Sequence, residues 1–273
     1  MVNANNQEFK GRVALITGGA RNIGFAIAKD LASRGASVAI ADICHDLKTI
    51  PYKLSSRQDL DHAVEALSAF NVRALGLICD VRVESQVKAT LQQVIERFGQ
   101  LDILVNNAGV ISLLPMEQLS ESAWGEVIDV CLKGTYLCCR HTLPHMIHRK
   151  YGKIVNISSV AGLGGLEHLV HYCAAKHGVI GLTKALAIEA AGHNINVNAI
   201  CPGTVESPCI EGLASQEGLR EDAYEYYSQG HLFQDHRITP TAIAQAVHWL
   251  VSDESRSLTG TILNVDAGWL AQA

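Results

Sequence analysis

Short apolar runs alternate with longer segments of helical period along nearly the whole chain, and this alternation narrows the possible folds more than any other feature. Seven runs predict strands, at residues 12–17, 37–41, 74–79, 103–106, 153–158, 196–201 and 261–265. The intervening segments predict helices, at residues 23–33, 58–69, 84–98, 124–149, 172–191 and 241–251. Strands that are apolar on both faces are typical of a buried parallel sheet, in which each crossover needs a helix.

No linker, repeat or low-complexity stretch divides the 273 residues. The sequence therefore predicts one α/β domain over residues 1–273, a Rossmann-type, doubly wound, seven-stranded parallel sheet with helices on both faces. Residues 206–237 are polar, rich in tyrosine and too long for an ordinary connection. We expect this segment to form a lid over a substrate site.

Charge and cysteine usage restrict the class of partner. A net charge of -5 argues against nucleic acid or an anionic membrane as the main partner, and no apolar run approaches the length of a membrane span. The polar residues 1–10 lack the apolar core of a signal peptide. The eight cysteines form no Cys-x-x-Cys motif and most lie in apolar runs, which indicates reduced thiols that pack as small hydrophobes. We expect a cytoplasmic protein without a metal site.

A glycine-rich turn, residues 17–24 (TGGARNIG), joins the first predicted strand to a helix. Glycines let the backbone approach a pyrophosphate, which then rests on the amides at the helix N-terminus. Asp42 ends the second strand, where a carboxylate accepts the ribose hydroxyls and repels a 2′-phosphate. Arg21 could favour a phosphate instead, but it is equally a solvated charge or a phosphate contact that does not discriminate. The cofactor predicted from Asp42 is NAD rather than NADP.

Tyr172 and Lys176 lie four residues apart, so their side chains share one face of a helix. Tyrosine has an ordinary pKa near 10, too high for a base at neutral pH. An ammonium about 4 Å away contributes at most about 4 kcal/mol at a dielectric of about 20, or roughly three pKa units. By itself such a pair is typical of a solvated helix face. Ser159 follows the fifth strand and Ser158 is its rival, both at the edge where such sheets bind ligands.

Together and in order, these motifs resemble the short-chain dehydrogenase/reductase family. The resemblance runs from about Gly11 to Gly268 and includes the glycine turn, Asp80-Val81, NNAG at 106–109, Ser159, Tyr172-x-x-x-Lys176 and Pro202-Gly203. It implies an oxidoreductase that moves a hydride between a secondary alcohol, or its ketone, and NAD. In it, Ser159 holds the substrate oxygen, Tyr172 is the general acid/base, and Lys176 assists. It also implies a homotetramer or homodimer.

The resemblance and the glycine turn together assign the cofactor contacts. Asp80 and Val81 would hold the adenine, Asn107 the adenosine ribose, and the Ile23 amide the pyrophosphate. The nicotinamide end would contact Val205 and Ser207. Many relatives have Thr at the position of Ser207. The expected cofactor set is Gly18, Asn22, Ile23, Asp42, Asp80, Val81, Asn107, Tyr172, Lys176, Val205 and Ser207.

Two residues depart from the family pattern. Asn22 replaces the usual middle glycine of the turn, and Asn is the non-glycine residue that best tolerates a left-handed backbone. Cys131 replaces an Asn that supports a helix kink, whose backbone carbonyl holds a water linked to the lysine. The cysteine keeps that carbonyl but lacks the amide. We expect Cys131 to pack rather than to bind metal or act as a nucleophile, and we expect the water to be retained.

An insertion, residues 44–58, follows Asp42 and contains Ile50-Pro51-Tyr52. It resembles an insertion of the carveol-dehydrogenase-like branch, which is often linked to the redox carrier mycofactocin and in which NAD can stay bound. The alternative is an ordinary surface loop. Substrate contacts are expected from residues 160–171, including Leu163, Leu166 and Leu169, from Trp269, and from the lid residues Tyr224, Tyr226, Tyr227, His231 and Phe233. His168 and His171 could bind a substrate oxygen, but a lone histidine on such a stretch is more often a surface or structural residue. These side chains fit a cyclic alcohol, namely a terpenoid, a steroid or a sugar.

Two other functions compete with this one. A catalytically silent, NAD-binding regulator or assembly subunit could use the same fold, and Asn22 and Cys131 would favour it. The intact Ser159, Tyr172 and Lys176 favour the enzyme. A sugar-nucleotide epimerase shares the cofactor and the tyrosine, but such enzymes usually have a larger C-terminal substrate domain than this chain leaves room for.

Overall fold

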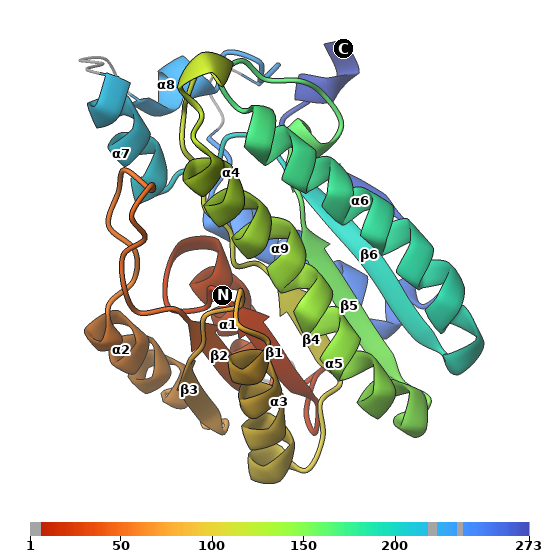
Figure 1. Ribbon diagram of the computed structural model, residues 1–273. Coiled ribbons are helices and arrows are strands. Elements are labelled where there is room, and N and C mark those ends of the chain that lie inside the picture. Colours follow the sequence, from red (N-terminus) through yellow and green to blue (C-terminus); the bar gives the residue numbers. More distant parts are fainter. Residues whose placement is uncertain (1–6, 218–222, 234–236, 273) are drawn as a thin grey trace.

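The computed structural model describes residues 7–217, 223–233 and 237–272. Its centre is a seven-stranded sheet in the order β3-β2-β1-β4-β5-β6-β7, and every neighbouring pair is parallel (Figure 1). This confirms the predicted doubly wound sheet. The strands are β1 (Val13–Thr17), β2 (Ser37–Asp42), β3 (Ala74–Ile78), β4 (Ile103–Asn106), β5 (Gly152–Ile157), β6 (Ile195–Pro202) and β7 (Ile262–Val265).

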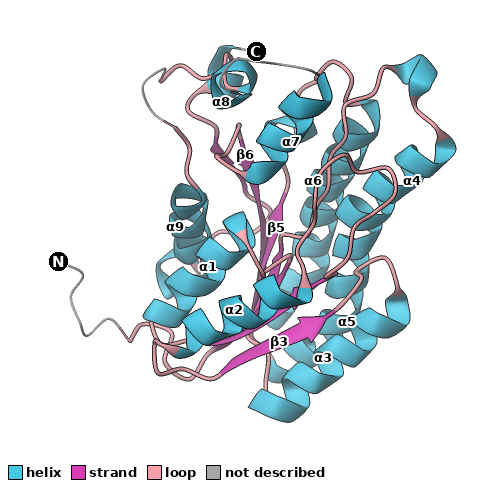
Figure 2. Cartoon of the chain, turned by 90° about the vertical axis from the view of Figure 1, so that its left-hand side faces the viewer, coloured by secondary structure: helices cyan, strands magenta, loops and turns pink. Residues whose placement is uncertain are grey.

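Helices cover both faces of the sheet (Figures 1 and 2). One face carries α1 (Asn22–Ser33), α2 (Arg57–Ser68) and α9 (Pro240–Val251), and the other carries α3 (Glu84–Phe98), α4 (Glu121–Ile128), α5 (Gly134–Arg149) and α6 (Val170–Ala190). None of the helices in the described part of the chain is both long enough and apolar enough to cross a membrane.

The alternation of side chains along β1 divides the apolar interior into two cores. Val13 and Leu15 belong to the core under α3, α5 and α6, whereas Ala14 and Ile16 belong to the core under α1, α2 and α9. A strand buried on both sides must be apolar at every position, and this is why the strands appear in the sequence as continuous runs rather than alternating ones.

The order of the strands fixes where a ligand can bind. β1 pairs with β2 on one side and with β4 on the other. The strands that follow β1 are added on one side as far as β3, and from β4 onward they are added on the opposite side. In open parallel sheets such a reversal leaves a crevice at the carboxyl ends of the strands. At that edge lie α7 (Pro208–Glu217) and α8 (Ala223–Tyr227), which belong to the predicted lid (Figure 1). Parts of the predicted lid, residues 218–222 and 234–236, lie outside the described residues.

Candidate active site

The glycine turn leads from β1 into α1 at the sheet crevice. Gly18 has a φ of 61°, and a side chain on Gly24 would collide with the Gly18 carbonyl oxygen. Asn22 has a φ of 49°, which confirms that Asn occupies a left-handed position in place of glycine. The Asn107 side-chain amide donates to the carbonyls of Thr17 and Gly18, at 2.9 and 3.0 Å. The turn is thus open to a pyrophosphate and is fixed from the end of β4, and this fits the predicted cofactor.

Asp42 lies buried at the end of β2, beside this turn. Its carboxylate accepts backbone N–H groups from Ala20 at 3.1 Å and from Ile43 at 2.9 Å. The carboxylate is therefore held against the turn. A carboxylate has about four lone-pair positions, so two backbone bonds leave acceptor capacity for the hydroxyls of a ribose.

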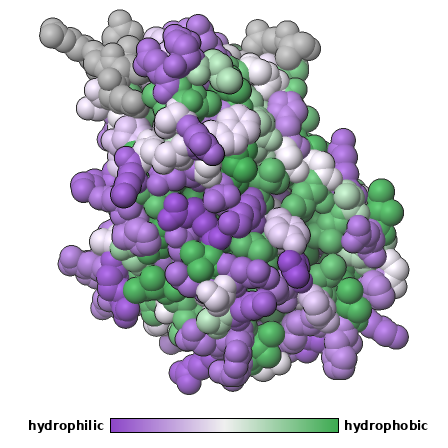
Figure 3. Space-filling view, viewed as in Figure 1, coloured by the Kyte–Doolittle hydropathy of each residue, from purple (hydrophilic) through white to green (hydrophobic). Residues whose placement is uncertain are grey.

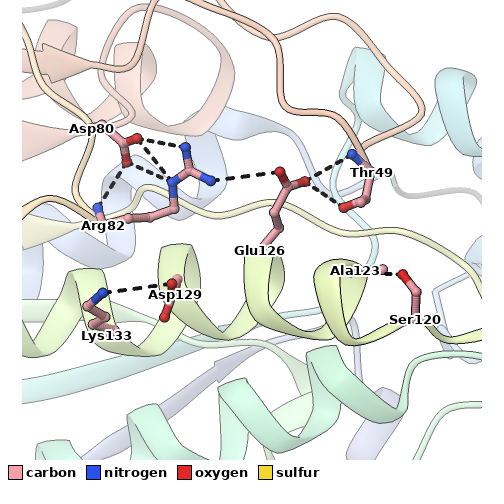
Figure 4. A network of polar contacts seen from close by, with 8 residues as sticks. All are labelled: Thr49, Asp80, Arg82, Ser120, Ala123, Glu126, Asp129 and Lys133. Atoms are coloured by element: carbon pink, nitrogen blue, oxygen red, sulfur yellow. Dashed lines mark hydrogen bonds and ion pairs between the residues drawn. The ribbon is translucent and has the colours of Figure 1, made fainter.

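A network that the sequence did not reveal surrounds Asp80 (Figure 4). Both carboxylate oxygens of Asp80 accept from the Arg82 guanidinium, with a shortest distance of 2.7 Å. Burial opposes ionisation of Asp80, but the hydrogen bonds from Arg82 outweigh it and lower the pKa of this carboxyl. Arg82 lies 3.8 Å from Glu126 of α4, which in turn accepts from the Thr49 N–H at 3.0 Å. The network thus connects the end of β3 to α4 and to the insertion.

The two serines after β5 have different roles. The Ser158 hydroxyl donates to the main-chain carbonyl of Lys176 at 2.9 Å and fixes α6 against the sheet. Ser159 Oγ accepts the Ala161 N–H at 3.1 Å, and its hydroxyl contacts the phenol of Tyr172 rather than a main-chain carbonyl. The contacts therefore favour Ser159 as the serine that holds a substrate, as the spacing predicted.

Tyr172 and Lys176 share the inner face of α6. The Lys176 Nζ donates to the Ile157 carbonyl at 2.8 Å and lies 5.4 Å from the centroid of the Tyr172 ring. Burial raises the pKa of Tyr172 well above its usual value, and contact with the Ser159 hydroxyl lowers it only partly. The favourable charge effect expected from Lys176 is therefore smaller than the cost of burial. The phenol is protonated at neutral pH, the form in which it acts as an acid.

The segment around Cys131 is a π-helix, Asp129–Lys133, between α4 and α5. The expected α-helix over residues 124–149 is therefore interrupted at this point, where the family resemblance predicts a kink. The Cys131 thiol is buried and donates to the Val110 carbonyl at 3.4 Å, so it packs as expected. The Thr135 hydroxyl donates to the Cys131 carbonyl at 2.8 Å. This occupies one of the two lone pairs that the relay water would use.

One cavity of about 720 Å³ brings the predicted residues together. Its wall includes every catalytic and cofactor residue expected from the sequence, namely Gly18, Asn22, Ile23, Asp42, Asp80, Val81, Asn107, Ser159, Tyr172, Lys176, Val205 and Ser207. No group of three or more His, Cys, Asp or Glu side chains in residues 7–217, 223–233 and 237–272 is placed to hold a metal ion.

The substrate end of the cavity agrees only in part with the sequence. Its lining includes the expected Leu166, His168, Leu169, Tyr226, Tyr227 and Trp269. Tyr224 and His231 are buried instead, where they accept the N–H groups of Ile238 at 2.6 Å and Thr204 at 3.1 Å, so they support the lid from within. His171 is fully buried against Ser112, and Leu163 and Phe233 are exposed outside the lining. A tyrosine or histidine is amphipathic, so composition alone did not separate these roles.

The insertion contributes to the same cavity through Leu47, Tyr52, Leu54 and Ser55. It is therefore not an ordinary surface loop. Its last two predicted residues begin α2, whose capping box joins Ser56 and Asp59. Tyr52 lies in the predicted insertion, but nothing in the sequence indicated that its side chain would reach the cavity.

Comparison with known proteins shows the family. The sequence profile of the short chain dehydrogenases matches residues 12–218. A 3-oxoacyl-[acyl-carrier-protein] reductase of Thermotoga maritima is 36% identical over 95% of this chain and 98% of its own length. A cis-4-hydroxycyclohexanecarboxylate dehydrogenase of Sinomonas cyclohexanicum is 36% identical over 97% of this chain and 99% of its own. The crystal structure of carveol dehydrogenase from Mycobacterium avium in complex with NAD superposes with a TM-score of 0.92, at 33% identity over 97% of this chain and 99% of that one. The chain belongs to the short-chain dehydrogenases and is an oxidoreductase.

Proposed function

We propose that the protein is an NAD-dependent dehydrogenase, or ketoreductase, that acts on a cyclic secondary alcohol or its ketone. The observation that carries this proposal is that one cavity is lined both by the glycine turn and Asp42 and by Ser159, Tyr172 and Lys176. The ring-bearing substrates named for two similar proteins, carveol and cis-4-hydroxycyclohexanecarboxylate, support the choice of a cyclic alcohol. The aromatic side chains of the lid and Trp269 offer flat surfaces for such a ring.

Each group in the cavity has a task in this reaction. The glycine turn would hold the pyrophosphate, Asp42 and Asn107 the adenosine ribose, and Asp80 and Val81 the adenine. NAD, when bound, supplies the hydride acceptor and a positive charge. The Ser159 hydroxyl donates to the substrate oxygen and orients it. Tyr172 exchanges the proton of that oxygen, as an acid in reduction and as a base in oxidation.

Lys176 supports the phenol of Tyr172. Only one of its three ammonium protons is committed within the described structure, to the Ile157 carbonyl. The other two remain for the ribose next to the nicotinamide and for a proton-relay water. Because burial raises the pKa of Tyr172, alcohol oxidation needs the combined positive charge of Lys176 and the cofactor. We therefore expect the oxidation rate to increase with pH.

The test is a screen of cyclic secondary alcohols with NAD, followed by reduced nicotinamide absorbance, and a matched pair of variants. Tyr172→Phe should reduce turnover by roughly 100-fold or more while NAD affinity, read from protein fluorescence, stays nearly constant. Tyr136→Phe is the control, because Tyr136 is exposed on α5 and does not belong to the lining of the cavity. A Tyr172→Phe protein that retains most of its turnover would remove Tyr172 from the mechanism.

We further propose that the chain acts as one domain, that residues 206–237 form its lid, that it assembles as a homodimer or homotetramer, and that it belongs to the carveol-dehydrogenase-like branch. A catalytically silent NAD-binding subunit is the alternative function. It is favoured by one observation, the contact of Thr135 with the carbonyl expected to hold the relay water. NAD binding without turnover of any alcohol or ketone would support that alternative.

A further inference from the structure

Two hydrogen bonds fix the insertion against neighbouring elements outside the cavity. Its Thr49 donates through the backbone N–H to Glu126 of α4, and its Lys53 carbonyl accepts from the Arg21 guanidinium at 2.7 Å. Glu126 is itself held by Arg82 (Figure 4). Tyr52 lies between these two anchors, so its position is set by contacts with α4 and with the glycine turn.

Tyr52 reaches from the insertion to the substrate side of the cavity. Its hydroxyl oxygen accepts the Ile111 N–H at 3.1 Å. Ile111 is adjacent to Val110, whose carbonyl accepts the Cys131 thiol, so Tyr52 contacts the segment that packs behind the catalytic side chains. On its other side the residue packs against α7, where an added Cβ on Gly212 would lie 2.5 Å from the Tyr52 Cβ. Tyr52 therefore fills the space between the floor of the cavity and the lid.

The hydroxyl of Tyr52 still has a proton to donate. Accepting the Ile111 N–H uses only a lone pair, and no side chain or carbonyl in the described ranges accepts the phenolic proton. Burial raises the pKa of Tyr52 well above its ordinary value, so the proton is present throughout the working pH range. Tyr52 is half-buried and lines the cavity, so a bound molecule with an acceptor can take this proton in place of water.

The charges around the cavity indicate that this acceptor is neutral. Of the lining cations, the Arg21 guanidinium donates to the Lys53 carbonyl, and the Lys176 ammonium lies beside Tyr172, where the reacting oxygen is held. Glu167, also in the lining, would repel a carboxylate. A carboxylate next to Tyr52 would therefore have no lysine or arginine of the described lining of its own to compensate for its desolvation.

We propose that Tyr52 is a specificity-determining residue that donates a hydrogen bond to a second, neutral oxygen of the substrate, a hydroxyl or a carbonyl. This inference rests on the proposed function, because the first oxygen is the one held by Ser159 and Tyr172. The preferred substrate is thus a cyclic alcohol or ketone that carries two oxygens on opposite sides of its ring. The insertion and α6 would recognise one oxygen each.

The test measures binding rather than turnover, with cyclohexane-1,4-dione and cyclohexanone as probes. With the protein saturated by NAD⁺, neither ketone can be reduced, so calorimetric titration gives their Kd values directly. We expect Tyr52→Phe to lose about 3- to 10-fold in the preference for the dione over cyclohexanone, the scale of one neutral hydrogen bond. The control is Tyr136→Phe, which removes the hydroxyl of an exposed tyrosine on α5 outside the cavity lining and should keep the preference. The Phe ring preserves packing against α7, so a purely structural role would weaken both probes equally.

An unchanged preference in Tyr52→Phe would overturn the inference. If the variant does not fold, 4-methylidenecyclohexanone replaces it as a probe of the unaltered protein, since it has the shape of the dione without the second acceptor. It should then bind about 3- to 10-fold more weakly than the dione, and equal binding would overturn the inference. Turnover of cyclohexanol separately tests the proposed function. If the protein oxidises no alcohol but discriminates the two ketones through Tyr52, the proposed function is wrong and the inference about Tyr52 stands.

Discussion

We expect Asp42 to decide between the two nicotinamide cofactors. Its carboxylate is buried beside the glycine turn and is held by the N–H groups of Ala20 and Ile43. We expect kcat/KM to be much higher with NAD than with NADP. Asp42→Ala should narrow the gap by weakening NAD about 10- to 100-fold, because hydrogen bonds to a charged acceptor are lost. Steady-state kinetics with both cofactors measure the gap, and equal efficiency in the unaltered protein would contradict the prediction.

Substitution of Cys131 tests the expected proton relay through the water near Lys176. We expect Cys131→Asn to fold, because the Val110 carbonyl that now accepts the thiol can accept the amide, and an amide buried without partners would cost about 1–3 kcal/mol. Turnover should rise modestly if the relay limits the rate and stay constant if hydride transfer or cofactor release does. The pH–rate profile at saturating NAD distinguishes these cases.

Cys131→Ser is the matched control for this substitution. It preserves the size of the side chain and also lacks an amide, so its profile should follow that of the unaltered protein. If Cys131→Asn oxidises an alcohol that neither Cys131→Ser nor the unaltered protein oxidises, the cysteine has disabled the relay. The silent-subunit alternative would then be preferred.

Among individual residues, the sequence predicted the cavity residues that follow strands. It did not predict those that tertiary contacts bring to the cavity. Asp42, Asp80, Asn107 and Ser159 each stand at or just after the end of a strand, and the ends of parallel strands meet at one edge of the sheet. Tyr52 reaches its partner Ile111 across 59 residues of sequence. The same holds for the contact of Thr49 with Glu126, 77 residues apart. No local pattern encodes such pairs.

Among the elements, helix boundaries were predicted well except where a side chain altered the backbone. The expected helix over residues 124–149 is divided by a five-residue π-helix, Asp129–Lys133. Here the Thr135 hydroxyl donates to the carbonyl four residues earlier, an interaction that often bends helices. The residues of this segment have ordinary helical periodicity, so hydrophobic spacing alone predicted a continuous helix. Only the family resemblance indicated an irregularity at this position.

The predicted lid is the part of the chain whose stability we expect to depend on pH. The His231 Nε2 accepts the Thr204 N–H, which requires this nitrogen to be unprotonated, and burial lowers the pKa of His231. A lowered pKa in the folded state means that the unfolded chain binds the proton first as pH falls. The stabilisation is therefore complete above about pH 6.5 and is lost progressively below it. We expect Tm to fall between pH 7.5 and pH 5.5.

His231→Gln provides the comparison. Glutamine can accept the Thr204 N–H through its side-chain oxygen but does not titrate. The decrease of Tm with pH should be smaller in this variant than in the unaltered protein. It should not vanish, because burial also lowers the pKa of His145 and His171. Identical slopes in the two proteins, measured by differential scanning fluorimetry, would show that His231 has no such role.

For the whole molecule, the outer face of α6 is the surface most suited to pairing between copies. Ala174, Gly181, Ala185 and Ile188 are exposed along it at helical spacing, and Ile188 is 81% exposed. Apolar side chains lie among polar ones on this side of the molecule (Figure 3). Leu137 of α5 is buried, and Leu182 and Leu186 of α6 pack on the core, so these three leucines belong to the interior and not to the exposed face. Small exposed residues let two helices approach closely.

We expect light scattering at micromolar concentration to give the mass of a dimer or a tetramer. Gly181→Arg should shift it to a smaller species without disturbing the fold, since an added Cβ there meets nothing within 4 Å. Gln93→Arg, an exposed substitution on α3 with the same charge, should leave the mass unchanged. A monomeric unaltered protein would contradict the prediction.

The packing of α1 against α9 determines when this fold can be completed during synthesis. Ile27 and Leu31 of α1 share one core with Ile243, Val247 and Leu250 of α9, so the first helix is covered by the last. At a translation rate of about 5–20 residues per second, α9 begins to be made roughly 10 to 40 s after α1 is finished. During that interval the apolar face of α1 lacks part of its cover on the nascent chain, a state prone to aggregation. The glycine turn is thus translated early, but the helix that follows it is fully packed only near the end of translation.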